Sequence, residues 1–410
     1  MKNVVLIAML LIGSTSFGAI WTKMSDFGGE ARHRTTMLTL GNKIYAGLGH
    51  YNGAGPNILF EDWWEFDPAT NAWTQKANYL GGICYHAAGF AIDDIGYVGT
   101  GRISPQGSTL VKDFFKYDPT TNTWTQLTDF PGTGRRGAVG FAIGEYGYVG
   151  TGSSSEDMYR YHPPTDTWTQ VASVPGGARM SAIGFSLEGN GYVGTGYRYN
   201  QGWSSTDFYK YDPSTDSWTQ IADVGIDPIN GPMPRMESTG FGLNGKGYVV
   251  TGVTISSGDN YKDFWEYDPA TDVWTCQEDF PGTARRYMSA TVLNGYAFVG
   301  LGTNGTNFKD FWRFDQALSV IEKNLDQISV NTYPNPATEF INISIDDFPS
   351  VSPEKLSMQF HNLLGQKVHE DEINLGENRI ETNNWLNGSY IYTILYNDSP
   401  IKTGKILVTK

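Results

Sequence analysis

The chain is short of cysteine and of charged residues. Two Cys among 410 residues cannot form a framework of disulfides. Charged residues make up 18 % of the chain, below the roughly 25 % usual for globular proteins. Lys and Arg number 29 against 43 Asp and Glu, which gives a net charge of −14. A chain this acidic is a poor nonspecific ligand for nucleic acid or for an anionic membrane, so neither is an expected partner.

Motifs of catalytic and metal chemistry are also scarce. The sequence has no His/Cys cluster with zinc spacing, no Asp-x-Asp-x-Asp-Gly calcium loop and no Gly-x-Ser-x-Gly elbow. A Ser-His-Asp triad has no fixed spacing, but no feature of this sequence points to one. We therefore predict no metal, no cofactor and no assigned catalytic residue.

Residues 1–19 (MKNVVLIAMLLIGSTSFGA) have the pattern of a secretory signal peptide. Lys2 precedes a nine-residue apolar run from Val4 to Ile12, and small residues follow up to a cleavage point at Gly18 or Ala19. The run is too short to span a membrane, and no later segment is long and apolar enough to do so. The alternative is an apolar N-terminal strand. We expect a mature chain that is secreted or held at the outer-membrane surface.

Glycine and aromatic residues are abundant because a unit of about fifty residues is repeated. Six segments end a strand with a Gly-x-Gly or similar run, at 45–49, 97–101, 148–152, 192–196, 248–252 and 298–302. An Asp-led aromatic run follows each one, beginning at Asp62, Asp113, Asp157, Asp207, Asp263 and Asp310. Five copies then carry a Trp-Thr pair, at Trp73, Trp124, Trp168, Trp218 and Trp274. Four short β-rich runs in such a period indicate the blades of a β-propeller.

The sixth copy lacks its Trp, and Trp21-Thr22 near the N-terminus supplies the missing strand. We predict that residues 20–315 form a closed six-bladed propeller whose N-terminal strand completes the last blade. The Gly-x-Gly runs, the Tyr-Asp-Pro turns and the following Trp resemble the kelch repeat family. Two features depart from that family: the two Gly are not adjacent, and His162 replaces an Asp. The resemblance implies an all-β, six-bladed kelch-type β-propeller.

Composition changes after the repeats. Residues 316–328 read as a linker, and alternating runs in 329–410 predict a small Ig-like β-sandwich. Four motifs in order are similar to the type A C-terminal sorting domain of the type IX secretion system; they contain Tyr333, Pro334, Asn335, Pro336, Gly365, Gly388 and Lys405. The resemblance implies a Bacteroidota-type source, the secretion machinery as a partner, and removal of the domain after export. The alternative is an ordinary accessory β-domain.

Two rings of charge recur once in each blade. The Asp residues that open the aromatic runs form one ring, and the other contains Arg32, Cys84, Arg135, Arg179, Arg235 and Arg285. Both rings lie at strand ends on one face, so we predict Arg–Asp ion pairs; the alternative is a cationic collar for an acidic ligand. Cys84 interrupts the Arg ring, which leaves one Asp without this partner. Cys84 and Cys276 fall in different blades, and we expect both to be free.

Residues that differ between blades are the candidates for function. Next to the Arg ring, the expected mouth of the central channel carries Arg34, His86, Arg136, Glu237, Arg286 and Tyr287. The loops between the second and third strands of the blades carry His50, Tyr51, Tyr197, Tyr199, Trp203, Tyr261 and Phe308. Exposed aromatic rings suit sugars or protein partners. The alternatives are a mouth closed by salt bridges and loops that pack on themselves.

These observations favour a secreted or cell-surface binding protein that recognises a glycan or a protein. A purely structural adhesion protein is close to that hypothesis. The alternative is an enzyme, because exported kelch propellers include sialic-acid (N-acetylneuraminate) mutarotases, which this chain resembles in repeat type and blade number. Such a reaction needs a proton shuttle and a carboxylate anchor. By residue type, Glu237 with Arg235 or Arg286 could supply them.

Overall fold

The computed structural model describes residues 21–53, 57–104, 109–227, 231–316, 328–348, 356–396 and 399–410. The predicted signal peptide and most of the predicted linker lie outside the described residues. The described chain divides into two compact units, Trp21–Phe314 and a C-terminal unit that begins at Asp315.

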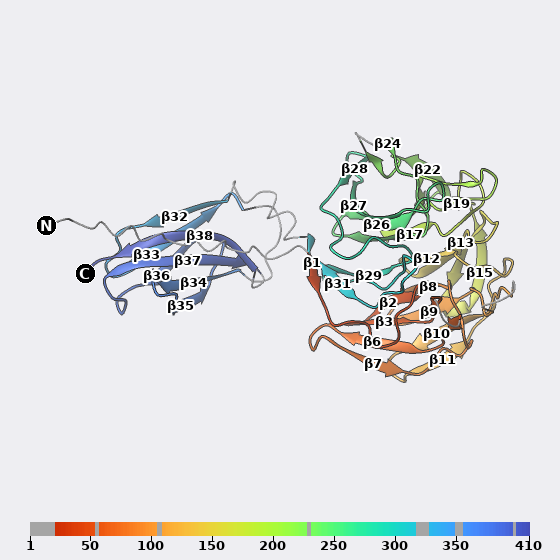
Figure 1. Cartoon of the computed structure of the whole chain (residues 1–410), viewed down its shortest axis with the longest axis horizontal. Coiled ribbons are helices and arrows are strands. Elements are labelled where there is room, and N and C mark those ends of the chain that lie inside the picture. The colour runs from red at the N-terminus through yellow and green to blue at the C-terminus, as the bar shows by residue number, and fades with distance from the viewer. Residues whose placement is uncertain are drawn as a thin grey trace. The chain divides into compact units, whose positions relative to one another are not determined.

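The first unit consists of six antiparallel four-stranded sheets. Neighbouring sheets touch through their first strands, and the contacts run in a closed cycle from β2 through β8, β12, β17, β25 and β29 back to β2 (Figure 1). The predicted six-bladed β-propeller is therefore confirmed. The first blade contains β2 (Thr36–Leu40), β3 (Lys43–Gly47), β6 (Trp63–Asp67) and β7 (Ala72–Lys76), and the second contains β8 (Ala88–Ile92), β9 (Ile95–Gly99), β10 (Phe114–Asp118) and β11 (Thr123–Gln126). The third contains β12 (Val139–Ile143), β13 (Tyr146–Gly150), β14 (Met158–His162) and β15 (Thr167–Val171), and the fourth contains β17 (Ile183–Leu187), β18 (Asn190–Gly194), β21 (Phe208–Asp212) and β22 (Ser217–Ile221). The fifth contains β25 (Thr239–Leu243), β26 (Lys246–Val253), β27 (Asn260–Asp268) and β28 (Val273–Cys276), and the sixth contains β29 (Ser289–Leu293), β30 (Tyr296–Gly300), β31 (Phe311–Phe314) and β1 (Trp21–Lys23).

The last blade takes its outer strand from the other end of the propeller. β1 pairs antiparallel with β31, and Trp21 lies opposite Phe314. The Trp21 ring packs at 5.2 Å from Phe264 and 5.4 Å from Phe280, both in the fifth blade. A ring closed by pairing leaves no sheet edge at the join.

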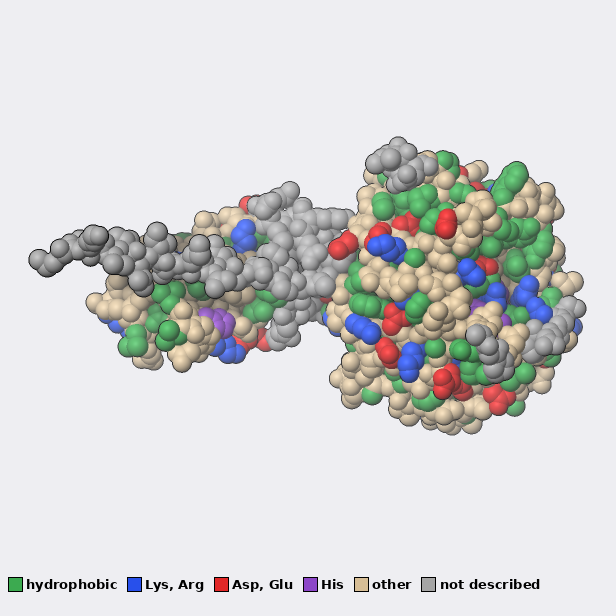
Figure 2. Space-filling model, in the orientation of Figure 1, with side chains coloured by type: hydrophobic (Ala, Val, Ile, Leu, Met, Phe, Trp, Pro, Cys, Tyr) green, Lys and Arg blue, Asp and Glu red, His purple; other side chains and the backbone are tan. Residues whose placement is uncertain are grey.

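Blades stack through aromatic rings on one side and bare backbone on the other. Gly147 of β13 shows why the Gly are needed, because an added Cβ would lie 2.0 Å from the Phe90 ring of the preceding blade. Acidic and basic side chains are interspersed on the visible face of the propeller (Figure 2).

Each outer turn also ties its blade to the preceding one. The Asn122 side chain accepts the backbone N–H of Ala77 at 2.9 Å, and the Trp124 indole donates to the carbonyl of the same Ala77 at 3.1 Å. The same two bonds recur with Asp166 and Trp168, Asp216 and Trp218, and Asp272 and Trp274. In these four copies the Trp of the Trp-Thr pair thus joins neighbouring blades.

Short elements lie in the connections between these strands. They are β4 (His50–Tyr51), β5 (Ile58–Leu59), the 3-10 turn η1 (Pro163–Thr165), β16 (Arg179–Met180), β19 (Tyr197–Arg198), β20 (Trp203–Ser204), β23 (Ile226–Asp227) and β24 (Gly231–Pro232).

The second unit is the predicted β-sandwich. One sheet has the order β32-β33-β36 and the other β35-β34-β37-β38. Their bounds are β32 (Ser329–Tyr333), β33 (Phe340–Asp346), β34 (Leu356–Asn362), β35 (Lys367–Glu372), β36 (Gly376–Glu381), β37 (Gly388–Tyr396) and β38 (Ser399–Val408).

Candidate functional site

The predicted Arg–Asp ion pairs are present in five blades. Each Arg is buried, and each guanidinium donates to both oxygens of its Asp. The Nη2–Oδ2 distances are 2.9 Å for Arg32–Asp62, 3.0 Å for Arg135–Asp157, 2.8 Å for Arg179–Asp207, 2.6 Å for Arg235–Asp263 and 3.0 Å for Arg285–Asp310. Each pair joins the starts of two strands of one blade. Arg235 is fully engaged in its pair, which excludes it as the anchor of a ligand carboxylate and leaves Arg286.

The second blade has Cys84 where the others have Arg. The buried Cys84 thiol donates to the carbonyl of Thr100 at 3.5 Å, and burial raises the pKa of this thiol to about 12. Among the described residues, Asp113 makes no ion pair, as the sequence predicts. Neither Cys84 nor Cys276 is in a disulfide, as expected.

Two of the predicted binding aromatics cover these ion pairs. The Arg235 guanidinium lies 4.8 Å from the ring centre of Tyr261, and that of Arg285 lies 3.8 Å from the ring centre of Phe308. Tyr261 lies on the long strand β27 and is not part of a loop. Phe60, which the sequence analysis did not single out, covers Arg32 in the same way at 3.6 Å. In these three blades the covering ring belongs to the residue two positions before the Asp, and this spacing is the sequence signal that identifies it.

Six backbone hydrogen bonds form a continuous ring around the channel mouth. In each blade one residue has a left-handed backbone, with φ between 55° and 65°. Its N–H donates to the carbonyl of the equivalent residue in the preceding blade, at 2.7–3.4 Å. The six residues are Arg34, His86, Gly137, Ser181, Glu237 and Tyr287. This ring fixes the direction in which four of the six predicted mouth side chains leave the backbone.

Glu237 is the centre of the polar network at the mouth. It is 8 % exposed, it accepts a hydrogen bond from the Tyr287 hydroxyl, and its other oxygen pairs with Nε of Arg286 at 3.1 Å. The Arg34 guanidinium donates to the Tyr287 hydroxyl at 2.7 Å and lies over its ring. Burial raises the pKa of Glu237 above its ordinary value, although Tyr287, Arg34 and Arg286 oppose the rise.

Three histidines at the mouth are neutral at neutral pH. Burial lowers the pKa of His33 to about 3, and its Nδ1 lies 2.7 Å from Oδ1 of Asn307. Burial also lowers the pKa of His86 well below its ordinary value, and that of His50 to a smaller extent. His50 is itself buried, stacked at 4.8 Å on Tyr85, so it belongs to the mouth and is not an exposed loop side chain.

The mouth therefore carries excess positive charge. Arg34, Arg136 and Arg286 face one carboxylate, that of Glu237, and Arg136 also donates to the Tyr85 hydroxyl at 3.4 Å. The predicted mouth residues thus come together in one cluster of contacts.

A cavity of about 280 Å³ opens beside this cluster. Its lining includes His33, Arg34, Arg286 and Tyr287, together with Asn52 and Thr303. Glu237 does not line this cavity itself, but it is bonded to Tyr287 and Arg286, which do. A second cavity of about 180 Å³ occupies the central channel between the first strands of the blades.

The other predicted loop aromatics lie at the surface. Tyr197 and Tyr199 pack edge to face at 5.2 Å, and Trp203 of the same hairpin is 56 % exposed. Tyr51 on β4 is half-buried. Among the described residues, no group of three or more His, Cys, Asp and Glu is arranged to hold a metal.

The predicted sorting motifs lie in turns and strands of the C-terminal sandwich. Tyr333 ends β32, and the 333–336 segment is tied to the last strand because the Asn335 side chain accepts the N–H of Leu407 at 2.9 Å. Gly365, at φ 79°, lies in the β34–β35 turn, and Gly388 begins β37. Lys405 lies on β38 opposite Ile391. Pro334 and Pro336 both follow cis peptide bonds.

Comparison with known proteins finds a family model that matches the C-terminal unit, and it finds relatives of the chain. Residues 331–409 match the model of the secretion system C-terminal sorting domain. The ulvan lyase NLR42 of Nonlabens ulvanivorans is 36 % identical over 81 residues, which is 20 % of this chain and 14 % of that protein. The N-acetylneuraminate epimerase of Pasteurella multocida (strain Pm70) is 25 % identical over 152 residues, 29 % of this chain and 40 % of that protein.

A solved structure, described as "Structure of YjhT", matches the fold. Its TM-score is 0.60 at 16 % identity, and the match covers 72 % of this chain and 96 % of that one. The chain spans less than half the length of the two curated relatives. The matches support a kelch-type β-propeller followed by a sorting domain that indicates export. No helix in the described ranges is long and apolar enough to cross a membrane.

Proposed function

We propose that this exported propeller binds a carboxylate-bearing sugar in the cavity at the channel mouth. The observation that carries the proposal is the cluster of Arg34, Arg136 and Arg286 around a single buried carboxylate, beside a cavity that two of these Arg line. Guanidinium groups bind carboxylates through paired, charge-assisted hydrogen bonds. The cavity is close to the lower end of the usual size of small-ligand sites, about 300 Å³, which suits one sugar ring.

The rest of the lining suits the other groups of such a sugar. Asn52 and Thr303 offer polar groups for hydroxyls, and Tyr287 offers an aromatic ring. The similarity to an N-acetylneuraminate epimerase supports the same class of ligand, because N-acetylneuraminate is a sugar acid.

Interconversion of the two anomers is the second candidate function, and the Tyr287–Glu237 pair favours it. Ring opening moves the proton of the anomeric hydroxyl to the ring oxygen and breaks the bond between the anomeric carbon and that ring oxygen. Tyr287 can accept that proton while its own passes to Glu237, and the reverse transfer protonates the ring oxygen. Burial raises the pKa of Glu237, which makes its carboxylate a better proton acceptor than that of an exposed Glu.

Binding can be tested by NMR titration of the full chain with N-acetylneuraminate, with neutral N-acetylmannosamine as the ligand control. Arg286→Met should weaken the affinity by roughly 10- to 100-fold, because a hydrogen bond to a charged group contributes about 1.5–3 kcal/mol. Arg160→Met is the matched control, because Arg160 is half-buried like Arg286 but does not line the cavity. No binding by the wild type, or equal loss in both variants, would refute the proposal.

The reaction can be tested in the same samples by following exchange between the anomers. Tyr287→Phe should remove roughly 10²- to 10⁴-fold of any acceleration, while the affinity changes much less. A wild-type exchange rate equal to that in buffer would rule out the enzymatic candidate and leave the binding proposal standing.

A further inference from the structure

The fourth blade carries a second, larger groove on the face where its loops lie. Its volume is about 750 Å³, and it opens between the β19–β20 hairpin and the segment around Pro232 and Pro234. Trp203 and Tyr209 contribute aromatic surface, and Gln220 contributes an exposed amide. The first blade has a hairpin at the equivalent place, β4–β5, but it carries Tyr51 where the fourth blade has Arg198.

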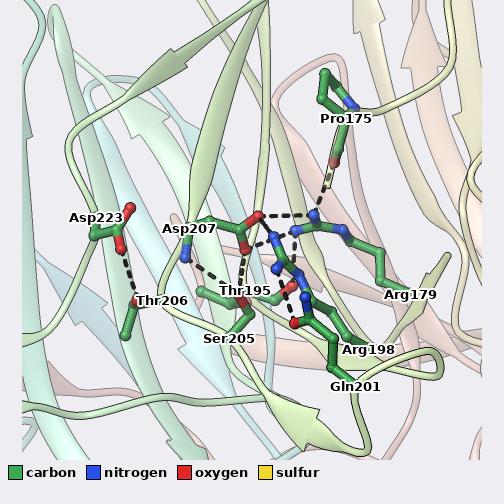
Figure 3. A network of polar contacts seen from close by, with 9 residues as sticks. All are labelled: Pro175, Arg179, Thr195, Arg198, Gln201, Ser205, Thr206, Asp207 and Asp223. Atoms are coloured by element: carbon green, nitrogen blue, oxygen red, sulfur yellow. Dashed lines mark hydrogen bonds and ion pairs between the residues drawn. The ribbon is translucent and has the colours of Figure 1, made fainter. Parts of the chain in front are cut away.

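A network of ion pairs holds one wall of the groove rigid (Figure 3). Asp207 pairs with Arg179, as in the other blades, and additionally with Arg198 of the hairpin. Ser205 also donates to Asp207, and Arg198 donates to the side-chain oxygen of Gln201 at 3.0 Å. Asp207 is thus saturated with donors, and its role is to fix Arg198 and, through Arg198, Gln201.

Several groups in the groove keep bonding capacity for a ligand. Trp203 is 56 % exposed, so its ring can stack on the C–H face of a sugar. The Gln201 side-chain oxygen is occupied by Arg198, which leaves its amide N–H₂ as a donor. One Asp223 oxygen accepts from the Thr206 hydroxyl at 2.8 Å, which leaves the other as an acceptor (Figure 3).

The charges of the groove cancel, unlike those of the mouth. Arg198, Asp207 and Asp223 line the groove, and the buried Arg179 behind Asp207 balances the second carboxylate. A charged ligand would gain no net attraction here, whereas a hydroxylated ring would find an acceptor, a donor and an aromatic platform. We propose that the groove binds a neutral saccharide, separately from the mouth cavity.

The test is binding of the full chain to an array of neutral and acidic oligosaccharides. Trp203→Ala should reduce retention on the neutral oligosaccharides by roughly tenfold or more. Gln201→Ala, a smaller change at the groove wall, should reduce it as well. Leu80→Ala is the matched control, because Leu80 is 58 % exposed and does not line the groove. Arg286→Met should leave neutral binding unchanged, which separates this site from the proposed mouth site.

Three results would overturn the inference. They are no retention of neutral oligosaccharides by the wild type, equal retention by Trp203→Ala and Leu80→Ala, and neutral binding that is lost in Arg286→Met. The last result would place the neutral sugar in the mouth cavity.

Discussion

The Arg–Asp pairs should be the most sensitive polar contacts of the propeller, and Arg135 offers the clearest test. Arg135→Met keeps most of the apolar stem and removes the guanidinium. The Asp157 carboxylate, whose side chain is 24 % exposed, then loses both of its bonds to Arg135. The Thr151 carbonyl also loses a donor that lies at 2.9 Å.

The expected loss of unfolding free energy is about 3–5 kcal/mol. Breaking a buried ion pair by removing one partner typically has this effect, because the other charge remains without compensation. Partial exposure of Asp157 lowers the figure, and the unpaired Thr151 carbonyl raises it by about 1–3 kcal/mol. A domain has only about 5–15 kcal/mol in total, so the variant should lie close to the limit of folding.

The second blade supplies the control. Asp113 has no Arg partner among the described residues, so Asp113→Asn should change the unfolding free energy by no more than about 0.5 kcal/mol. The double variant Arg135→Met/Asp157→Leu should recover much of the loss, because it removes the buried charge as well.

Urea unfolding of the full chain, followed by Trp fluorescence, measures these changes. Trp385 is the single Trp beyond residue 315, so the signal reports mainly on the propeller. We expect a lower midpoint with an unchanged slope. A loss below about 1 kcal/mol for Arg135→Met, or an equal loss for Asp113→Asn, would refute this reasoning.

Two other predictions concern pH and the contacts between blades. His33 titrates near 6.5 when unfolded and at about 3 when folded, so its contribution to stability is complete above pH 6.5 and declines as the pH falls towards 3. The unfolding free energy should therefore fall more steeply between pH 7 and pH 4 in the wild type than in His33→Asn, and parallel curves would contradict this. Asn122→Gly keeps the left-handed backbone (φ 53°) but removes the bonds to the Ala77 N–H and the Tyr117 hydroxyl. It should lower the unfolding free energy by about 1–2 kcal/mol, whereas no change in urea midpoint would show that these bonds add little.

The repeated features of this molecule could be predicted from the sequence, and the features unique to one blade could not. Arg135 and Asp157 recur at equivalent positions in other blades, so their pairing follows from strand direction alone. The Tyr287–Glu237 contact joins two blades. It depends on the left-handed backbone of both residues, which the side chains themselves do not favour.

Burial of individual loop residues was also beyond sequence reasoning. His50 and Tyr261 read as exposed aromatics, but short pairings such as His50 with Leu59 and Tyr261 with Gly252 draw them into strands. Arg198, which fixes the groove of the fourth blade, carries no repeat signal because the equivalent positions hold other residues, such as Tyr51 and Thr254.

The position of β1 has a consequence for how the chain matures. Trp21 finds its partner Phe314 only after every blade between them has been made. Contacts between residues so far apart form late, because a long loop must close before they stabilise anything. The ring therefore cannot close before residue 314 has been made, so its closure requires all six blades.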